Sequence, residues 1–456
     1  MLNLADIRKV FLIGIGGIGM SALARYFKLM GKEVNGYDKT QTALVTQLIR
    51  EGINIHFEDS VDLIPTDTDL VIYTPAIPAQ HAQFQYFKDN GYSLYKRSQI
   101  LGFLSNEYKV LAVAGTHGKT TTSSLLTHLL LSGGIDCTAF LGGISESLGS
   151  NFVFGKSPWM VVEADEYDRS FLTLHPEHSV ITSADPDHLD IYGNEAEMLK
   201  TFVQFASQNS KNGQVFIKEG LAITQDVKAL HTNVQTYGIG AGEIYASEIT
   251  IKEGYFHFDY CNNGTSYHDL KISLPGRHNI ENAVAAISVA SLLGVTEADI
   301  RHALVSFKGI KRRFEFIHRG RVSYIDDYAH HPGELAAAIQ AARELYPEAR
   351  ITGIFQPHLY TRTRDFADGF AAVLDTLDEI WLMDIYPARE LPIEGVDSKM
   401  LLEKMQNPNA RLMSRNQILE ATSSLEQGLL MTLGAGDIDT LVKPISEILK
   451  EKQHEN

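Results

Sequence analysis

Two short apolar runs that each lead into a glycine-rich loop constrain the fold of this chain most. Residues 10–13 lead into the loop 14–19, and residues 110–114 lead into the loop 115–120. A helical pattern follows each loop. A strand, a tight glycine turn and a helix together form the first unit of an α/β domain with a parallel sheet. The sequence therefore predicts at least two such domains, each beginning at one of these units.

Further strands alternate with helical patterns along most of the chain, which is typical of parallel sheets covered by helices. We expect them at residues 70–73, 159–162, 179–182, 322–325, 350–355 and 379–383. A chain of 456 residues exceeds what a single hydrophobic core supports. We therefore expect three domains, with boundaries near residue 107, before the second glycine unit, and near Arg313, between a helical segment and a new strand.

The composition excludes several classes of protein. The formal net charge of -16 disfavours sequence-independent binding to nucleic acid or to anionic lipid, because both need a basic surface. Cys137 and Cys261 are the only cysteines, too few for a disulfide framework, which fits a reducing compartment. No apolar stretch has the pattern of a secretion signal or a membrane helix. We therefore expect a cytoplasmic protein with no nucleic-acid partner and no membrane insertion.

The first glycine loop has the spacing G-x-G-x-x-G of nucleotide-binding turns. Its glycines let the backbone approach a diphosphate, and the helix that follows offers unpaired amide donors. Asp38 stands at the end of the next predicted strand, where a carboxylate can accept a hydrogen bond from a ribose hydroxyl. The candidate nucleotide-binding residues are Gly14, Gly16, Gly17, Ile18, Gly19 and Asp38. The loop by itself leaves three interpretations open: a nicotinamide cofactor, another nucleotide diphosphate, or a tight turn without a ligand.

The second glycine loop is more specific, because a strand, a loop and a helix follow one another around a Gly-Lys-Thr sequence. Amides and the lysine of such loops hold the phosphates of ATP, and the hydroxyl after the lysine binds magnesium. Lys119 and Thr120 occupy these positions. The candidate ATP-binding residues of the loop are Gly115, Thr116, His117, Gly118, Lys119, Thr120 and Thr121. Val113 stands where the longer phosphate-loop pattern has its first glycine, so this loop has the shorter form G-T-x-G-K-T.

Carboxylates and a histidine follow two of the predicted strands. Glu163 comes directly after residues 159–162, and His188 lies a few residues beyond 179–182. The carboxyl ends of parallel strands form the edge at which α/β sheets bind ligands. Magnesium prefers oxygen ligands and shares them with substrate phosphates, so Thr120 and Glu163 are candidate metal ligands, with His188 a less typical one. Taken singly, each of these side chains also fits a solvated strand end or a helix cap.

Six motifs, taken in order, make the sequence similar to a known family. They are Gly14-Ile-Gly-Gly-Ile-Gly-Met-Ser-Ala22, Gly115-Thr-His-Gly-Lys-Thr-Thr121, Glu163-Ala-Asp-Glu166, Asp187-His-Leu-Asp190, Leu274-Pro-Gly-Arg-His-Asn279 and Asp326-Asp-Tyr-Ala-His-His-Pro332. Together they resemble the Mur ligases of peptidoglycan synthesis. The resemblance covers nearly the whole chain and is far more specific than either glycine loop alone.

The resemblance implies an α/β fold with three domains. An N-terminal Rossmann-like domain at 1–107 would bind a UDP-sugar. A central P-loop ATPase domain with a mostly parallel sheet would occupy 108–313, and a C-terminal Rossmann-like domain at 314–456 would bind an amino acid. By this resemblance the first glycine loop holds UDP and not NAD. We expect either a monomer or a homodimer.

The resemblance also implies the reaction and its cofactor. ATP, as a substrate, would transfer its γ-phosphoryl group to the lactyl carboxylate of UDP-N-acetylmuramate, and L-alanine would attack the resulting acyl phosphate. Two Mg²⁺ ions, for which Mn²⁺ can substitute, would offset the repulsion between the two anions. Thr120 and Glu163 would hold one ion, and Glu163 and His188 the second.

The remaining site residues are carried over on the same resemblance. Lys119 would stabilise the β- and γ-phosphates, and His330 and Arg362 would orient the alanine. The catalytic candidates are Lys119, His188, His330 and Arg362, and the further ATP-binding candidates are Asn279, Asn282, Arg313 and Asp327.

One departure from the family pattern and two alternative functions are left open. Leu359 stands where many relatives carry arginine, which leaves Arg362 and Arg364 as candidates for binding the amino-acid carboxylate. Within the family, the alternative is a recycling ligase that attaches a ready-made tripeptide to the same UDP-sugar. From another class, the alternative is an NAD-dependent oxidoreductase, which would leave Lys119 and Glu163 without a role.

Overall fold

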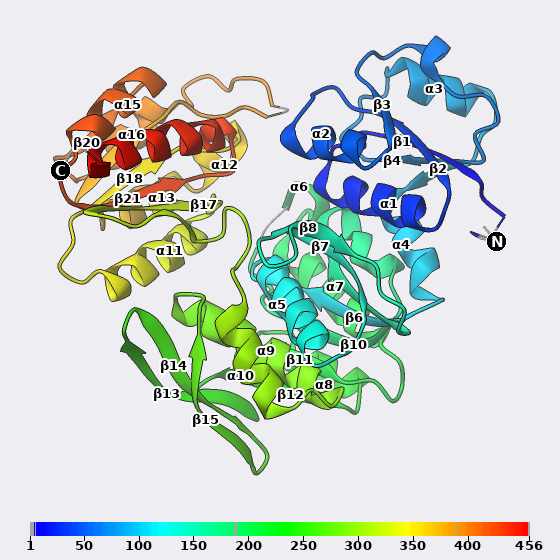
Figure 1. Ribbon diagram of the computed structural model, residues 1–456, viewed down its shortest axis with the longest axis horizontal. Coiled ribbons are helices and arrows are strands. Elements are labelled where there is room, and N and C mark those ends of the chain that lie inside the picture. The colour runs from blue at the N-terminus through cyan, green and yellow to red at the C-terminus, as the bar shows by residue number, and fades with distance from the viewer. Residues whose placement is uncertain (1–3, 5, 187–188, 389, 455–456) are drawn as a thin grey trace. The chain divides into compact units, whose positions relative to one another are not determined.

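Three β-sheets combined with helices make up the computed structural model (Figure 1), which describes residues 4, 6–186, 189–388 and 390–454. The chain forms two compact units. The first comprises Met1–Ser247, Asp259–Leu270 and Glu281–Phe307, and the second comprises Glu248–Phe258, Lys271–Ile280 and Lys308–Asn456. Among the described residues, every helix is too short or too polar to cross a lipid bilayer.

The first sheet has five parallel strands in the order β3-β2-β1-β4-β5. The strands are β1 Lys9–Ile13, β2 Glu33–Tyr37, β3 Asn54–His56, β4 Leu70–Tyr73 and β5 Leu94–Lys96, and the helices are α1 Ile18–Leu29, α2 Ala43–Arg50, α3 Ala82–Asp89 and α4 Arg97–Ser105. The chain adds β2 and β3 on one side of β1 and then crosses to the other side to add β4 and β5. In such sheets, ligands bind at the carboxyl ends of the strands beside this crossing, which is where the first glycine loop lies.

The second sheet has ten strands in the order β15-β14-β13-β12-β11-β10-β6-β9-β7-β8. Its strands are β6 Lys109–Ala114, β7 Thr138–Ser145, β8 Ser150–Val153, β9 Trp159–Ala164, β10 Pro176–Ile181, β11 Val215–Lys218, β12 Val234–Ile239, β13 Ile244–Lys252, β14 Tyr255–Asn262 and β15 Thr265–Ile272. The helices of this part of the chain are α5 Lys119–Ser132, α6 Leu189–Tyr192, α7 Glu195–Ser207, α8 Thr224–Leu230, α9 Arg277–Leu292 and α10 Glu297–Ser306. The central strand β6 is parallel to both of its neighbours, β9 and β10.

The third sheet has six strands in the order β16-β17-β21-β18-β19-β20, and only the edge strand β16 is antiparallel. Its strands are β16 Glu315–His318, β17 Val322–Asp327, β18 Ile351–Phe355, β19 Glu379–Leu382, β20 Ala410–Leu412 and β21 Gly428–Leu433. The helices are α11 Pro332–Leu345, α12 Tyr360–Asp365, α13 Ala367–Leu374, α14 Ser398–Lys404, α15 Arg415–Ser424 and α16 Val442–His454. Separate apolar cores, one around Leu335 and one around Trp381, pack with this sheet.

These three sheets confirm the predicted α/β fold with mostly parallel pairing. The strand predicted at 70–73 has the same bounds in the structure. The strand predicted at 179–182 instead spans Pro176–Ile181. Its pairing with β6 is irregular between Pro176 and His178, and the hydroxyl of Thr182, just beyond its end, donates to the His117 carbonyl. The proposed domain boundaries near 107 and 313 remain predictions.

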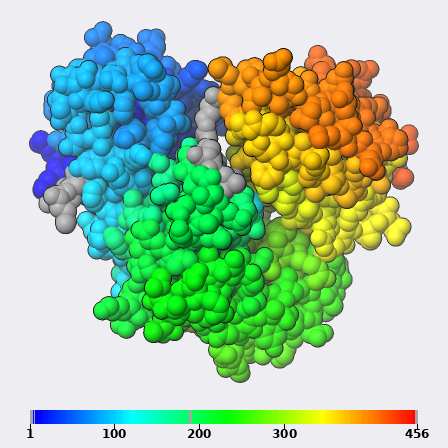
Figure 2. All heavy atoms as spheres, turned by 180° about the vertical axis from the view of Figure 1, so that it is seen from behind, coloured from blue at the N-terminus to red at the C-terminus, as the bar shows by residue number. Residues whose placement is uncertain are grey.

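The first sheet shares one apolar core with the part of the second sheet that precedes residue 230, and this explains why both lie in the first compact unit. The ring of Tyr26 on α1 lies 5.8 Å from that of Phe140 and 6.2 Å from that of Phe152, both of the second sheet. Figure 2 shows the blue surface of the first sheet and its helices adjoining the cyan and green surface of the residues that follow. Asn151 joins the same contact by donating to the Ser21 hydroxyl over 3.0 Å. Both glycine loops therefore belong to one compact unit.

Candidate active site

The first glycine loop lies between β1 and α1 and is closed by a carboxylate. Gly14 has φ +82°, where a side chain would be strained. The amide of Gly16 donates to Oδ2 of Asp38 over 2.7 Å, and a Cβ atom on Gly16 would lie only 2.7 Å from the same oxygen. The structure therefore brings Asp38 to the loop, as its predicted role at a nucleotide requires.

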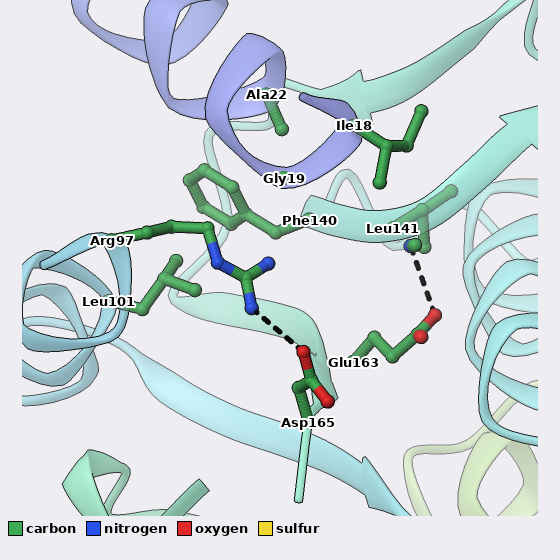
Figure 3. Close-up of a pocket in the computed structure, with 10 residues that line it drawn as sticks. Ile18, Gly19, Ala22, Arg97, Leu101, Phe140, Leu141, Glu163 and Asp165 are labelled. Atoms are coloured by element: carbon green, nitrogen blue, oxygen red, sulfur yellow. Dashed lines mark hydrogen bonds and ion pairs between the residues drawn. The ribbon is translucent and has the colours of Figure 1, made fainter. Parts of the chain in front are cut away.

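Arg97 lies directly over this loop, although the sequence analysis had not selected it. A Cβ atom on Gly19 would lie 2.1 Å from Nη1 of Arg97, so only glycine leaves room for the guanidinium. Figure 3 shows Arg97 reaching from α4 into a pocket that Gly19, Glu163 and Asp165 also line. Nη2 of Arg97 donates to Oδ2 of Asp165 over 3.3 Å. The pocket thus connects the first glycine loop with the acidic end of β9.

The second glycine loop joins β6 to α5 and is braced by the end of β10. Gly115 has φ +136°, and a Cβ atom there would lie 2.1 Å from the Thr182 hydroxyl. The Ser183 hydroxyl accepts a hydrogen bond from the amide of His117 over 2.7 Å and pairs with the Thr116 hydroxyl over 2.9 Å. This brace was not predicted from the sequence. Its only sequence signal is a Thr-Ser pair directly after an apolar strand.

Lys119 begins α5, and its ammonium group points back into the loop. Nζ donates to the Gly115 carbonyl over 2.5 Å and to Oε2 of Glu166 over 2.7 Å. Burial lowers the pKa of Lys119, but the carboxylates of Glu166, Asp165 and Glu163 outweigh it, so that the pKa is raised above its ordinary value. The lysine is therefore positively charged at neutral pH, as binding of phosphate requires.

Glu163 and Thr120, the two predicted magnesium ligands within the described residues, carry a carboxylate and a hydroxyl. Glu163 lies in β9, beside β6, and its Oε2 accepts a hydrogen bond from the amide of Gly142 over 3.0 Å. Thr120 is buried in the first turn of α5. A hydroxyl and a carboxylate fit the oxygen preference of Mg²⁺. In the described part of the chain no three His, Cys, Asp or Glu side chains gather as a metal site, and His188 lies outside the described residues.

The two predicted asparagines belong to different compact units. Asn282 lies at the second glycine loop, because its Oδ1 accepts from the Thr122 hydroxyl over 3.2 Å and would lie 2.7 Å from a Cβ atom on Gly118. Asn279 belongs to the second unit, where its side-chain amide donates to the Pro275 carbonyl over 2.7 Å. The structure thus places Asn282 beside the phosphate loop.

In the second unit, Asp327 ends β17, and each of its two carboxylate oxygens accepts one backbone hydrogen bond. Its oxygens accept from the amides of Phe314 and Ala329, each over 2.7 Å. Burial raises the pKa of Asp327 to about 6, although nearby Arg313 lowers it. Asp327 thereby fixes the segment that carries both Arg313 and the predicted alanine-binding residue His330.

Glu334, which was not predicted as a site residue, lies among three residues that were: Arg313, His330 and Arg362. Glu334 contacts Arg313 at 3.6 Å and Nδ1 of His330 at 3.2 Å. The ring of His330 lies 6.1 Å from that of His358, which contacts Arg362 at 3.5 Å. Burial lowers the pKa of His330, with Glu334 opposing this effect. This cluster combines cationic and neutral donors, which suits an amino acid carboxylate.

Leu359, the departure from the family pattern, has an uncommon backbone conformation. Its φ of +70° and ψ of +137° are rarely adopted by residues with a side chain. The conformation is held by a hydrogen bond of 3.0 Å from its amide to the Tyr386 carbonyl. Strained residues of this kind cluster at binding sites, and Leu359 directly precedes the helix that carries Arg362 and Arg364.

Three family models match the chain in succession. They are described as "Mur ligase family, catalytic domain" at residues 9–109, "Mur ligase middle domain" at 113–290 and "Mur ligase, glutamate ligase domain" at 312–437. The fold and the paired nucleotide loops agree with these matches, and the chain belongs to the Mur ligase family.

Similar proteins cover the whole chain. A UDP-N-acetylmuramate–L-alanine ligase of Flavobacterium psychrophilum is 47% identical, over 99% of this chain and 100% of its own length. One of Porphyromonas gingivalis is also 47% identical, over 97% and 99%. The crystal structure of a UDP-N-acetylmuramate-alanine ligase from Thermotoga maritima matches with a TM-score of 0.84 at 28% identity, over 98% and 100%. A murein peptide ligase from Psychrobacter arcticus shares the fold, with a TM-score of 0.73 at 22% identity, over 97% and 98%.

Proposed function

We propose that this chain is an ATP-dependent ligase that joins L-alanine to the lactyl carboxylate of UDP-N-acetylmuramate in the synthesis of peptidoglycan precursors. One observation carries the proposal: relatives named for this activity are 47% identical over nearly the full length of both chains. The charged Lys119 in a strand-loop-helix unit supplies the phosphate site that the reaction needs.

The second glycine loop prepares the carboxylate for attack. The amides of the loop and Lys119 would hold the β- and γ-phosphates, with Asn282 supporting the loop beside Gly118. Thr120 and Glu163 would hold one Mg²⁺ and Glu163 with His188 a second, and bound ions of this kind, or Mn²⁺, neutralise the charge between phosphate and carboxylate. Transfer of the γ-phosphoryl group turns a carboxylate oxygen into a leaving group, which an amine can then displace.

The first glycine loop would hold the diphosphate of the UDP-sugar, with Asp38 toward the ribose. Ile18 and Gly19 at the start of α1 line the same pocket as Arg97 and Glu163 (Figure 3). A sugar anchored at Gly16 and Gly19 would therefore extend its lactyl group toward the phosphate loop. Two loops joined by one pocket suit a UDP-sugar, because its diphosphate lies at one end of the molecule and its reacting carboxylate at the other.

In the second unit, His330 and Arg362 would orient L-alanine, while Arg313, Asp327 and Asn279 would complete the nucleotide site. Their support is the cluster around Glu334 described above. We also propose domain boundaries near residues 107 and 313, a cytoplasmic location, and a monomer or homodimer that binds no nucleic acid.

The two alternative functions have less support. Peptide ligases of this kind are represented among the similar structures by one match at 22% identity with a TM-score of 0.73 and by another at 28% identity with a TM-score of 0.62, over 67% of this chain. The alanine-ligase structure matches better, with a TM-score of 0.84 over 98% of this chain. An NAD-dependent oxidoreductase gives no role to Lys119 or Glu163, whereas Mur ligase family models match residues 9–109, 113–290 and 312–437.

The decisive assay is ATP-dependent phosphate release with UDP-N-acetylmuramate and each of a panel of amino acids or the tripeptide. We expect release only when the sugar is present, with L-alanine as the preferred amine. Turnover without the sugar, or with the tripeptide alone, would contradict the proposal. Binding of NAD, measured by calorimetry, would instead favour the oxidoreductase.

A further inference from the structure

A buried carboxylate beside the phosphate loop has no part in the reaction as described so far. Glu166 follows β9 and is only 2% exposed. Its Oε2 accepts a hydrogen bond from Nζ of Lys119 over 2.7 Å, and the lysine side chain is 13% exposed. A buried charge of this kind is costly unless it is paired and hydrogen-bonded. Its position against the phosphate-binding lysine therefore calls for a functional explanation.

The ammonium group of Lys119 has three hydrogens, and the structure offers it three protein acceptors. These are Oε2 of Glu166 at 2.7 Å, the Gly115 carbonyl at 2.5 Å and the Thr116 carbonyl at 3.4 Å. A phosphate oxygen must replace one of them, because a lysine has no further donor. The contact with Thr116 is the longest and involves a neutral acceptor, so it is the one most easily exchanged. The hydrogen bonds to Glu166 and Gly115 would then fix the direction in which the third N–H of Lys119 points toward the phosphate.

Glu166 is itself held from several sides. Its carbonyl accepts a hydrogen bond of 2.6 Å from the hydroxyl of the buried Tyr192. The chain turns sharply just after it, at Asp168 and Arg169, which both have positive φ. Asp168 pairs with Lys96 at 2.5 Å. A carboxylate on so constrained a backbone can set the position of the longer and more flexible lysine.

We propose that Glu166 is a positioning residue that aims the ammonium group of Lys119 at the transferring phosphoryl group. The inference rests on the proposed function. Glu166 does not touch the substrate; it acts by keeping the lysine charge where negative charge develops during transfer. Such preorganised contacts matter more in the transition state than in the ground state. Loss of Glu166 should therefore lower kcat more than it raises the KM for ATP.

The test compares Glu166→Gln with the wild-type enzyme in steady-state assays of phosphate release. Glutamine keeps the size and one acceptor oxygen but removes the charge. We expect kcat to fall about ten- to a hundredfold, the range for loss of a hydrogen bond to a charged group, and the KM for ATP to change less than about threefold. The KM values for the sugar and for L-alanine should not change. A merely structural role would instead lower thermal stability and disturb all three KM values.

Two further variants serve as an intermediate case and as a control. Glu166→Asp keeps the charge and therefore the pairing of the buried lysine, and its kcat should lie between those of Glu166→Gln and the wild type. Glu197→Gln is the matched control, because Glu197 pairs with Lys200 at 2.6 Å in the same part of the chain but is 45% exposed. Its kinetic constants should equal those of the wild type.

The outcomes separate this inference from the proposed function. Wild-type turnover together with an unchanged kcat in Glu166→Gln would overturn the inference alone. A rise in the KM for ATP at unchanged kcat, or no difference between Glu166→Asp and Glu166→Gln, would overturn it too. Wild-type enzyme that consumes no ATP with the sugar and L-alanine would overturn the proposed function, and this inference with it.

Discussion

Arg97 and Asp165 form an ion pair of 3.3 Å that joins the first glycine loop to the acidic end of β9. Arg97 begins α4 of the first sheet, whereas Asp165 directly follows a central strand of the second. The guanidinium fills the space that a side chain at Gly19 would need. A residue of the part proposed to bind the UDP-sugar is therefore held by the part proposed to bind ATP.

Arg97→Lys should weaken binding of the UDP-sugar. Lysine keeps the charge but loses the planar fork that lets arginine contact two oxygens at once. We expect the KM for UDP-N-acetylmuramate to rise about tenfold, as for loss of one charge-assisted hydrogen bond, with little change in the KM for ATP. Arg50→Lys, at the exposed end of α2, is the control. An unchanged sugar KM would show that Arg97 serves only to join the two sheets.

Lys119→Ala should abolish turnover while the fold persists. The lysine is proposed to stabilise charge during phosphoryl transfer, and loss of one such donor costs about 10²- to 10³-fold in kcat. Burial raises the pKa of Glu166, so this carboxyl can take up a proton when its partner is removed, which limits the cost to folding. Phosphate release and circular dichroism measure the two effects. Near-normal rates would place the ATP site elsewhere.

Arg312→Met should destabilise the second unit strongly. Nε of Arg312 donates to Asp326 over 3.0 Å, and Asp326 is only 1% exposed. Removing the arginine leaves a buried charge without its partner, which costs about 3 kcal/mol or more in the free energy of unfolding. The double variant with Asp326→Asn should recover part of this loss. Lys443→Met, which removes an 85% exposed partner, should cost less than about 1 kcal/mol. Urea unfolding, followed by fluorescence, distinguishes these cases.

Asp327→Asn should change how stability depends on pH. Because burial raises the folded-state pKa of Asp327 to about 6, above the value of about 3.9 in an unfolded chain, the folded protein binds more protons between these values. Its stability should therefore fall as the pH rises from about 4 to about 6, by at most about 3 kcal/mol.

Asp327→Asn lacks this titration, so its stability should not show the same fall. Urea unfolding at about pH 4 and about pH 6 measures the difference. Asp368→Asn, whose side chain is 90% exposed, should behave as the wild type. Equal pH dependence in the wild type and Asp327→Asn would mean that Asp327 is ionised throughout this range.

Much of the fold was predictable because it depends on local patterns. The apolar run at 70–73 and the strand-loop-helix unit around Lys119 appear in the structure nearly as expected. Side-chain partners from distant segments were not predictable. The brace from Ser183 to the phosphate loop spans 66 residues of sequence, and the contact from Arg97 to Asp165 spans 68. No periodicity or motif spacing encodes such pairs, since they arise only when the sheets are assembled.

The antiparallel additions to the second sheet were also missed. β8 pairs with β7 in antiparallel fashion, which the alternation of strands and helices did not indicate. Glu334 was overlooked for a related reason. In the sequence it is one acidic residue in the first turn of a helix, a common place for such residues, and only the fold shows that it contacts both Arg313 and His330.

Asp165 and Glu166 are neighbours in the chain, yet one contacts Arg97 and the other contacts Lys119. Inserting or deleting one residue after β9 would present the wrong carboxylate to each partner, even if the composition of the segment stayed the same. The length of this turn is therefore under as much constraint as its residues. Among relatives, variation here should take the form of substitutions, whereas insertions should accumulate in exposed connections such as the one between β14 and β15.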